Sequence, residues 1–158
     1  MTDQRLGDHF WLSEFLRSDT AVRHGLDNMP DAREVGNVIN VLVPGMQRVR
    51  NSLGVPVQIT SGYRSQAVER ALKRKPDSWR SGSQHAEGLA ADFVAPQFGT
   101  CRSIVKYLME RSGEIRFDQL IYEGSWVHVS FAADRPRSEV LTAHFMAGGA
   151  VSYSKGLA

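Results

Sequence analysis

The first third of the chain carries its apolar residues at helical spacing. From Asp31 onward they recur three or four residues apart, at Ala32, Val35, Val38, Ile39, Leu42, Met46, Val49 and Leu53. This period predicts a helix over residues 31–53. Pro44 should bend or divide it, and Gly54 followed by Pro56 should end it. A short helical turn is expected over residues 12–16, followed by irregular chain as far as Pro30.

Farther along, the pattern changes to short alternating runs. Residues 57–60, 89–94, 119–123 and 126–131 read as strands. Between them, helices are predicted over residues 65–75, capped by Ser65, and 100–111, capped by Thr100. The tail after Arg135 is weakly patterned. Helices first and strands later predict an α+β fold with a small, mostly antiparallel sheet.

Composition limits the class of protein but does not indicate a function. The chain has 158 residues, 42% of them hydrophobic, and a formal charge of +2. We expect a single domain over residues 1–158 and a monomer. The basic excess is too slight to indicate a nucleic-acid partner. Residues 1–15 lack the apolar run of a secretory leader, and no segment has the roughly 20 apolar residues of a membrane span.

Metal-binding chemistry is indicated by histidine and carboxylate rather than by thiolate. Cys101 is the lone cysteine, which excludes an internal disulfide and a zinc-finger site. Within residues 83–92, His85 leaves a loop and Asp92 lies on the strand that follows. Gly88 permits a sharp turn between them. The alternative to a metal site is that His85 and Asp92 form a hydrogen-bonded structural pair.

The second candidate segment is the hairpin around Gly124 and Ser125. A two-residue turn there would place Ile121 opposite His128. Glu123 would then be a diagonal neighbour of His128, about 7–8 Å away between backbones, within reach for a general base. Otherwise His128 is a core histidine and Glu123 ends an exposed strand. Two imidazoles, one carboxylate and an open position form a catalytic zinc set.

These motifs resemble the LAS metallopeptidases. The resemblance rests on Ser83-x-His85-x-x-Gly88-x-Ala90-x-Asp92, on Trp126-Val127-His128, and on the upstream segment Ser61-Gly62-Tyr63-Arg64-Ser65. It implies a hedgehog and D-Ala-D-Ala peptidase-like fold, with Zn²⁺ held by His85, Asp92 and His128. By the same resemblance, Arg64 engages a substrate carbonyl or carboxylate.

The sequence departs from many relatives at the catalytic glutamate. They place it three residues before the last histidine, where this chain has Ser125. Glu123, five residues before His128, is the nearby carboxylate. In this spacing the chain resembles the phage-type relatives. Residues 10–28 and 119–123 are also similar to that subfamily.

The resemblance implies a zinc peptidase that cuts peptidoglycan stem peptides or cross-links, at D,D or L-Ala-D-Glu bonds. A phage lysis enzyme, made in the host cytoplasm and acting on the wall after release, or carried by the virion, fits the absence of a leader. Two alternatives stay open: a non-catalytic zinc-containing binding module of the same fold, and a cytoplasmic D,D-dipeptidase. The choice between carboxypeptidase and endopeptidase also stays open.

Overall fold

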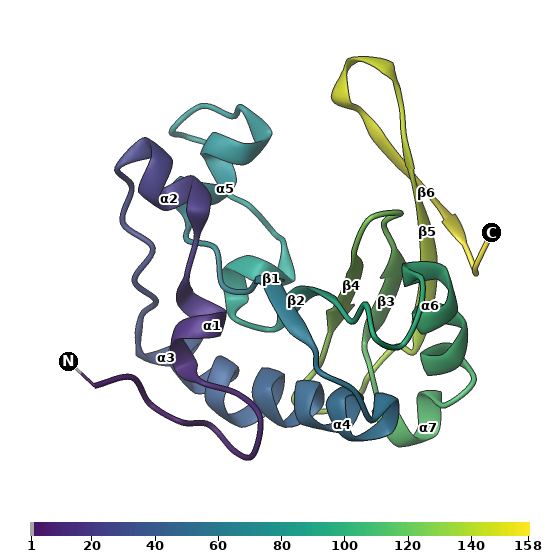
Figure 1. Ribbon diagram of the computed structural model, residues 1–158. Coiled ribbons are helices and arrows are strands. Elements are labelled where there is room, and N and C mark those ends of the chain that lie inside the picture. Colours follow the sequence, from purple (N-terminus) through teal and green to yellow (C-terminus); the bar gives the residue numbers. More distant parts are fainter. Residues whose placement is uncertain (1) are drawn as a thin grey trace.

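The computed structural model describes residues 2–158 and has an α+β fold with one six-stranded, mostly antiparallel sheet (Figure 1). Its strand order is β1-β2-β4-β3-β5-β6, and within the described chain β3–β5 is the one parallel pair. The strands are β1 Gln58–Ser61, β2 Ala90–Val94, β3 Gln119–Tyr122, β4 Val127–Ser130, β5 Glu139–Phe145 and β6 Val151–Lys155. The predicted fold class is confirmed.

The helices that accompany this sheet are short. They are α1 Leu12–Leu16, α2 Asp19–His24, α3 Ala32–Asn37, α4 Val43–Leu53, α5 Gln66–Lys73, α6 Cys101–Met109 and α7 Ser112–Ile115, with short 3₁₀ turns at Gln84–Glu87 and Ala147–Gly149. In residues 2–158 no helix has the length and apolar character needed to traverse a bilayer.

The helix predicted from residue 31 to residue 53 is confirmed as one continuous helical run. Asp31 caps it by accepting from the Glu34 backbone N–H at 2.8 Å. A π-helical turn, Val38–Leu42, precedes Pro44 and joins α3 to α4. The wider turn relieves the contact that a proline ring makes with the preceding helical turn. Gly54 ends α4 in the left-handed conformation, with φ of 68°.

Two segments differ from the sequence prediction. The stretch expected to be irregular contains α2, which Ser18 caps at 3.1 Å from the Ala21 backbone nitrogen. The weakly patterned tail forms the antiparallel β5–β6 hairpin. Every residue of β6 is exposed, so the strand has no buried face to produce an alternating signal.

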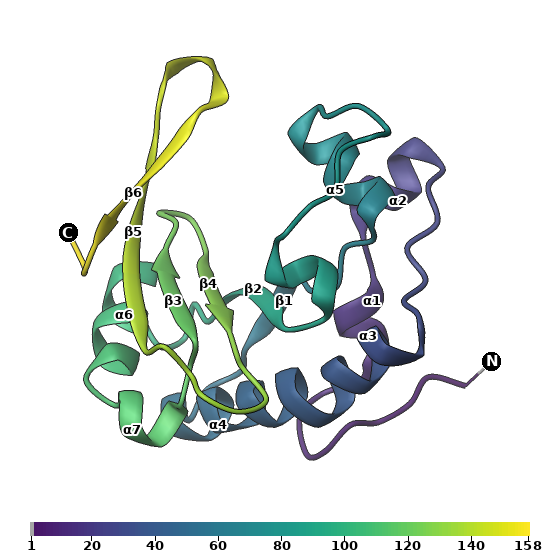
Figure 2. The ribbon, with the colours of Figure 1, turned by 180° about the vertical axis from the view of Figure 1, so that it is seen from behind.

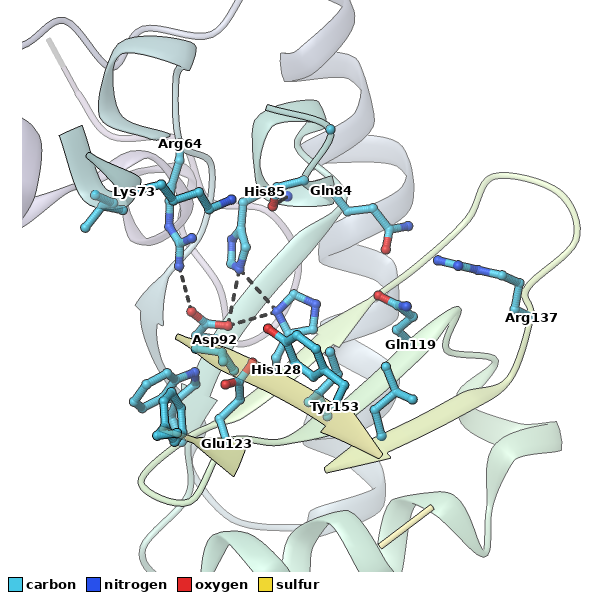
Figure 3. A pocket seen from close by; sticks show the side chains of 18 residues that line it. Arg64, Lys73, Gln84, His85, Asp92, Gln119, Glu123, His128, Arg137 and Tyr153 are labelled. Atoms are coloured by element: carbon cyan, nitrogen blue, oxygen red, sulfur yellow. Dashed lines mark hydrogen bonds and ion pairs between the residues drawn. The ribbon is translucent and has the colours of Figure 1, made fainter. Parts of the chain in front are cut away.

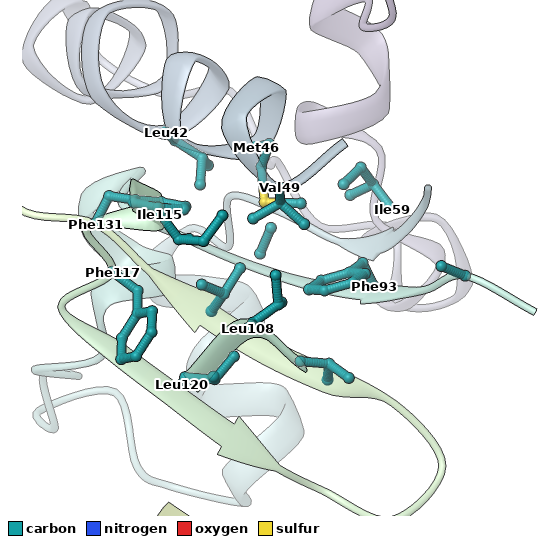
Figure 4. Packing of buried hydrophobic residues seen from close by; sticks show 14 of the residues in the cluster. Leu42, Met46, Val49, Ile59, Phe93, Leu108, Ile115, Phe117, Leu120 and Phe131 are labelled. Atoms are coloured by element: carbon teal, nitrogen blue, oxygen red, sulfur yellow. The ribbon is translucent and has the colours of Figure 1, made fainter. Parts of the chain in front are cut away.

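The sheet has one face covered by the core and one face open. α4 and α6 pack on the covered face, where Met46, Val49 and Leu108 meet Phe93 and Leu120 (Figure 4). On the other side, the α2–α5 region and the β5–β6 hairpin rise as two arms (Figures 1 and 2). The candidate functional residues lie between these arms.

Candidate metal centre

Three side chains from separate elements converge on one point. Asp92 in β2 and His128 in β4 are direct partners across the sheet, and His85 comes from the 3₁₀ turn before β2. His85 Nε2 and His128 Nδ1 lie 3.2 and 3.1 Å from Asp92 Oδ1, and 3.2 Å from each other (Figure 3). The strand register predicted for the hairpin, Ile121 opposite His128, is confirmed.

The His85 ring is oriented by backbone groups. Its Nδ1 donates to the Gly62 carbonyl at 2.7 Å, which leaves the Nε2 lone pair free for a ligand when the ring is neutral. Ser83 Oγ accepts from the His85 backbone N–H at 3.2 Å. Gly88, with φ of 74°, then turns the chain into β2. The loop therefore fixes both the position and the tautomer of His85.

The protonation states suit a metal ion. Burial lowers the pKa of His85, which favours the neutral imidazole. Burial alone would raise the pKa of Asp92, but the adjacent His85 and His128 hold it well below its usual range. One anionic oxygen and two imidazole nitrogens, all within 4.8 Å of one another, form a donor set that fits a divalent transition metal.

Arg64 lies behind Asp92 at the edge of the cleft. Its NH2 group donates to Asp92 Oδ2 at 2.9 Å, and Nε donates to Ser61 Oγ at 2.9 Å. Its NH1 group donates to Glu69 Oε1 at 3.2 Å. Arg64 therefore turns Oδ1 of Asp92 toward the histidines. The sequence did not single out Glu69, a fully buried carboxylate that also pairs with Lys73.

Glu123 lies at the end of β3, on the same side as His128. Its backbone N–H donates to the Trp126 carbonyl at 3.2 Å and closes the hairpin. Within residues 2–158 its carboxylate has no hydrogen-bond partner, although the residue is only 9% exposed. Burial raises the pKa of Glu123. Such a carboxylate is free to accept a proton from a molecule in the cleft.

A cleft of about 730 Å³ surrounds these groups. One wall comes from α5 and the loop before His85, and the other from the β5–β6 hairpin. At its far end, Asp118 accepts from Gln84 Nε2 at 2.9 Å and from Arg137 NH2 at 2.7 Å. The sequence analysis missed Arg137 and Tyr153, which line the cleft, and Asp118, which holds Arg137, because these contacts are tertiary.

The Peptidase M15 family model matches residues 8–130. The chain belongs to the peptidase M15 family. A search of curated proteins finds no match to it. Peptidases of this family are metalloenzymes, so membership implies peptidase activity that depends on a metal. In this M15 peptidase, His85, Asp92 and His128 are the group that could hold the ion.

Proposed function

We propose that this protein is a zinc peptidase that hydrolyses peptide bonds in bacterial peptidoglycan, and that it serves as a phage lysis enzyme. The observation that carries the proposal is the convergence of His85 Nε2, Asp92 Oδ1 and His128 Nδ1 in a cleft that also holds an unpaired Glu123. Family membership supports the reaction class.

In this proposal, His85, Asp92 and His128 hold the zinc. The ion, when bound, would polarise the peptide carbonyl and lower the pKa of a water molecule. Glu123 accepts the proton of the attacking water and then delivers a proton to the leaving amine. Arg64 orients Asp92. Its NH1 and NH2 groups each give one hydrogen to Glu69 or Asp92, and the second hydrogen of each can meet a substrate carbonyl or carboxylate.

A peptidoglycan peptide suits the cleft in size and charge. A volume of about 730 Å³ lies in the range of roughly 300–1,000 Å³ that substrate clefts occupy. Arg64, Lys73 and Arg137 lie along it and favour the carboxylates of stem peptides. The resemblance of the motifs to wall-cleaving peptidases supports the same substrate, and that of residues 10–28 to the phage-type subfamily supports the lysis role.

The test is digestion of purified peptidoglycan with zinc, and again with a chelator. We expect released peptides only with zinc, and mass spectrometry of the products would identify the bond that is cut. Wall binding without release would indicate the non-catalytic module. Turnover of free D-Ala-D-Ala without digestion of walls would indicate the D,D-dipeptidase.

Two variants test the assigned roles. Glu123→Ala should keep its zinc and lose about 10²–10⁴-fold in turnover, whereas His128→Ala should lose both zinc and activity. Glu110→Ala and His24→Ala are matched controls on the exposed surface. Near-full activity in Glu123→Ala would remove the base assignment, and normal zinc content in His128→Ala would remove the ligand set.

A further inference from the structure

The β5–β6 hairpin forms a wall of the cleft that the family match does not include. The match ends at residue 130, and the hairpin begins at Glu139. It contributes Leu141, Phe145, Val151 and Tyr153 to the cleft. In Figures 1 and 2 the hairpin stands beside β3 and faces the arm that carries α5.

The strand register directs Tyr153 toward the metal centre. Tyr153 pairs with Ala143 across β5 and β6, and the parallel pairing of β3 with β5 runs to Tyr122 opposite Thr142. Continued by one residue, this register would place Ala143 beside Glu123, and both Glu123 and Tyr153 line the cleft. With strands about 4.8 Å apart, the Tyr153 backbone is roughly 10 Å from that of Glu123. The small Ala143 side chain lets the tyrosine ring cross this gap.

The Tyr153 hydroxyl is available to a bound molecule. Figure 3 shows its oxygen turned toward Asp92. Over the described part of the chain it has no hydrogen-bond partner, whereas the Arg64, Gln84 and Arg137 side chains all donate to protein acceptors. Tyr153 itself is 53% exposed, so a substrate can reach it.

The charges around Tyr153 keep it a donor. Burial and the carboxylates of Glu123 and Asp92 raise the pKa of its hydroxyl, which remains protonated at neutral pH. A neutral donor suits the carbonyl oxygen of a peptide bond, on which negative charge develops during hydrolysis.

We propose that Tyr153 is a further catalytic residue, whose hydroxyl donates a hydrogen bond to the carbonyl oxygen of the scissile bond from the hairpin side of the cleft. This inference rests on the proposed peptidase function. The hydrogen bond strengthens as charge builds on that oxygen, so it lowers the barrier more than it tightens substrate binding.

The test compares Tyr153→Phe with Tyr122→Phe. The first substitution removes only the hydroxyl from the cleft. Tyr122 belongs to β3, which β5 separates from β6 in the sheet, and it packs against the core. We expect kcat to fall about 10²-fold or more in Tyr153→Phe, with KM, zinc content and circular dichroism unchanged. Tyr122→Phe should match the wild type.

A second measurement uses a phosphinate analogue of the scissile peptide bond. Its affinity should fall in Tyr153→Phe by a factor comparable to the loss in kcat, because it mimics the charged oxygen. If the wild type digests walls and Tyr153→Phe stays within about twofold of it, where a lost oxyanion donor removes about 10²–10³-fold, this inference is wrong while the peptidase proposal stands. A rise in KM alone also overturns the catalytic assignment. A wild type that releases no peptide overturns both.

Discussion

At the scale of single residues, the orientation of His85 depends on a backbone carbonyl, that of Gly62. A Cβ atom on Gly62 would lie 2.4 Å from the Phe15 carbonyl oxygen. Residue 62 must therefore be glycine for α1 to pack against the end of β1. The sequence analysis quoted Gly62 within a motif but gave it no role, because the close approach of Phe15 is a tertiary contact.

Gly62→Ala should weaken both the fold and the metal centre. The added methyl forces the backbone at residue 62 or at Phe15 to move, which in a packed core costs about 1–3 kcal/mol. The displaced carbonyl also loosens His85. Chemical denaturation and zinc titration would measure both effects. Gly113→Ala, where nothing lies within 4 Å of the new methyl, is the control, and equal behaviour of the two variants would contradict the prediction.

The pH profile of activity should report Glu123. Because burial raises its pKa, the base becomes protonated at a higher pH than an ordinary glutamate, whose pKa is about 4.3. Activity is present while Glu123 is ionised and falls as the pH drops through its raised pKa. The measurement is kcat/KM against pH, with zinc content checked at each point. The residual activity of Glu123→Gln should lack this acid limb; a limb retained there belongs to another group.

At the scale of elements, capping residues and apolar periodicity were sufficient to predict a helix or strand where that element has one buried face. Ser65 and Thr100 cap α5 and α6 as predicted, accepting from the backbone at 3.3 and 3.1 Å. α6 buries Ile104 and Leu108 on one side of the helix, and this buried side produced the helical spacing of apolar residues in the sequence. β6 and the single turn of α7 have little or no such stripe, so their positions depend on partners distant in the sequence.

The resemblance identified Asp92 and His128 from the sequence, and the structure brings them together because they lie on adjacent strands in direct register. The sequence analysis did not predict the contacts around them, because Glu69 reaches Arg64 from α5 and Tyr153 reaches the cleft from β6. Neither contact has a fixed spacing in the sequence.

The segment that leads from β4 to β5 is attached to β3 through Asp118. Its carboxylate accepts from Nε and NH2 of Arg137 and from the Arg137 backbone N–H at 2.8 Å. The Arg137 hydrogen bonds hold the pKa of Asp118 below its usual range. This carboxylate therefore stabilises the fold above its unfolded pKa of about 3.9, and the contribution is lost as the pH falls through the lower folded value.

Asp118→Asn should remove this acid-sensitive contribution. The wild type should lose stability steeply below about pH 4, the range in which Asp118 becomes protonated. The variant should be less stable at pH 7 and show a flatter decline in acid. Denaturant titrations at several pH values would measure it, with the exposed Asp77→Asn as control. Parallel pH curves for wild type and Asp118→Asn would contradict the prediction.

At the scale of the whole molecule, the two faces of the sheet have different tasks. The covered face packs Phe93, Leu120 and Phe131 against α4 and α6. The open face gathers Asp92, His128 and Glu123 between the arms. Asp92 and His128 lie 36 residues apart in the sequence, so the unfolded chain has no preformed site, and metal binding is coupled to folding.

Zinc should therefore stabilise the folded protein by an amount that grows with the logarithm of the free zinc concentration. At a free concentration 100 times the Kd, binding adds about 2.7 kcal/mol. For a domain of this size that raises Tm by roughly 5–10 °C. Differential scanning calorimetry across a zinc series would measure the shift, and Mg²⁺, which prefers oxygen ligands, should produce none. His24→Ala should retain the shift, whereas His128→Ala should lose it because one nitrogen of the donor set is gone. An equal rise in Tm for His128→Ala would mean that zinc binds elsewhere, and the assigned centre would then be wrong even if the wild type proved to be a peptidase.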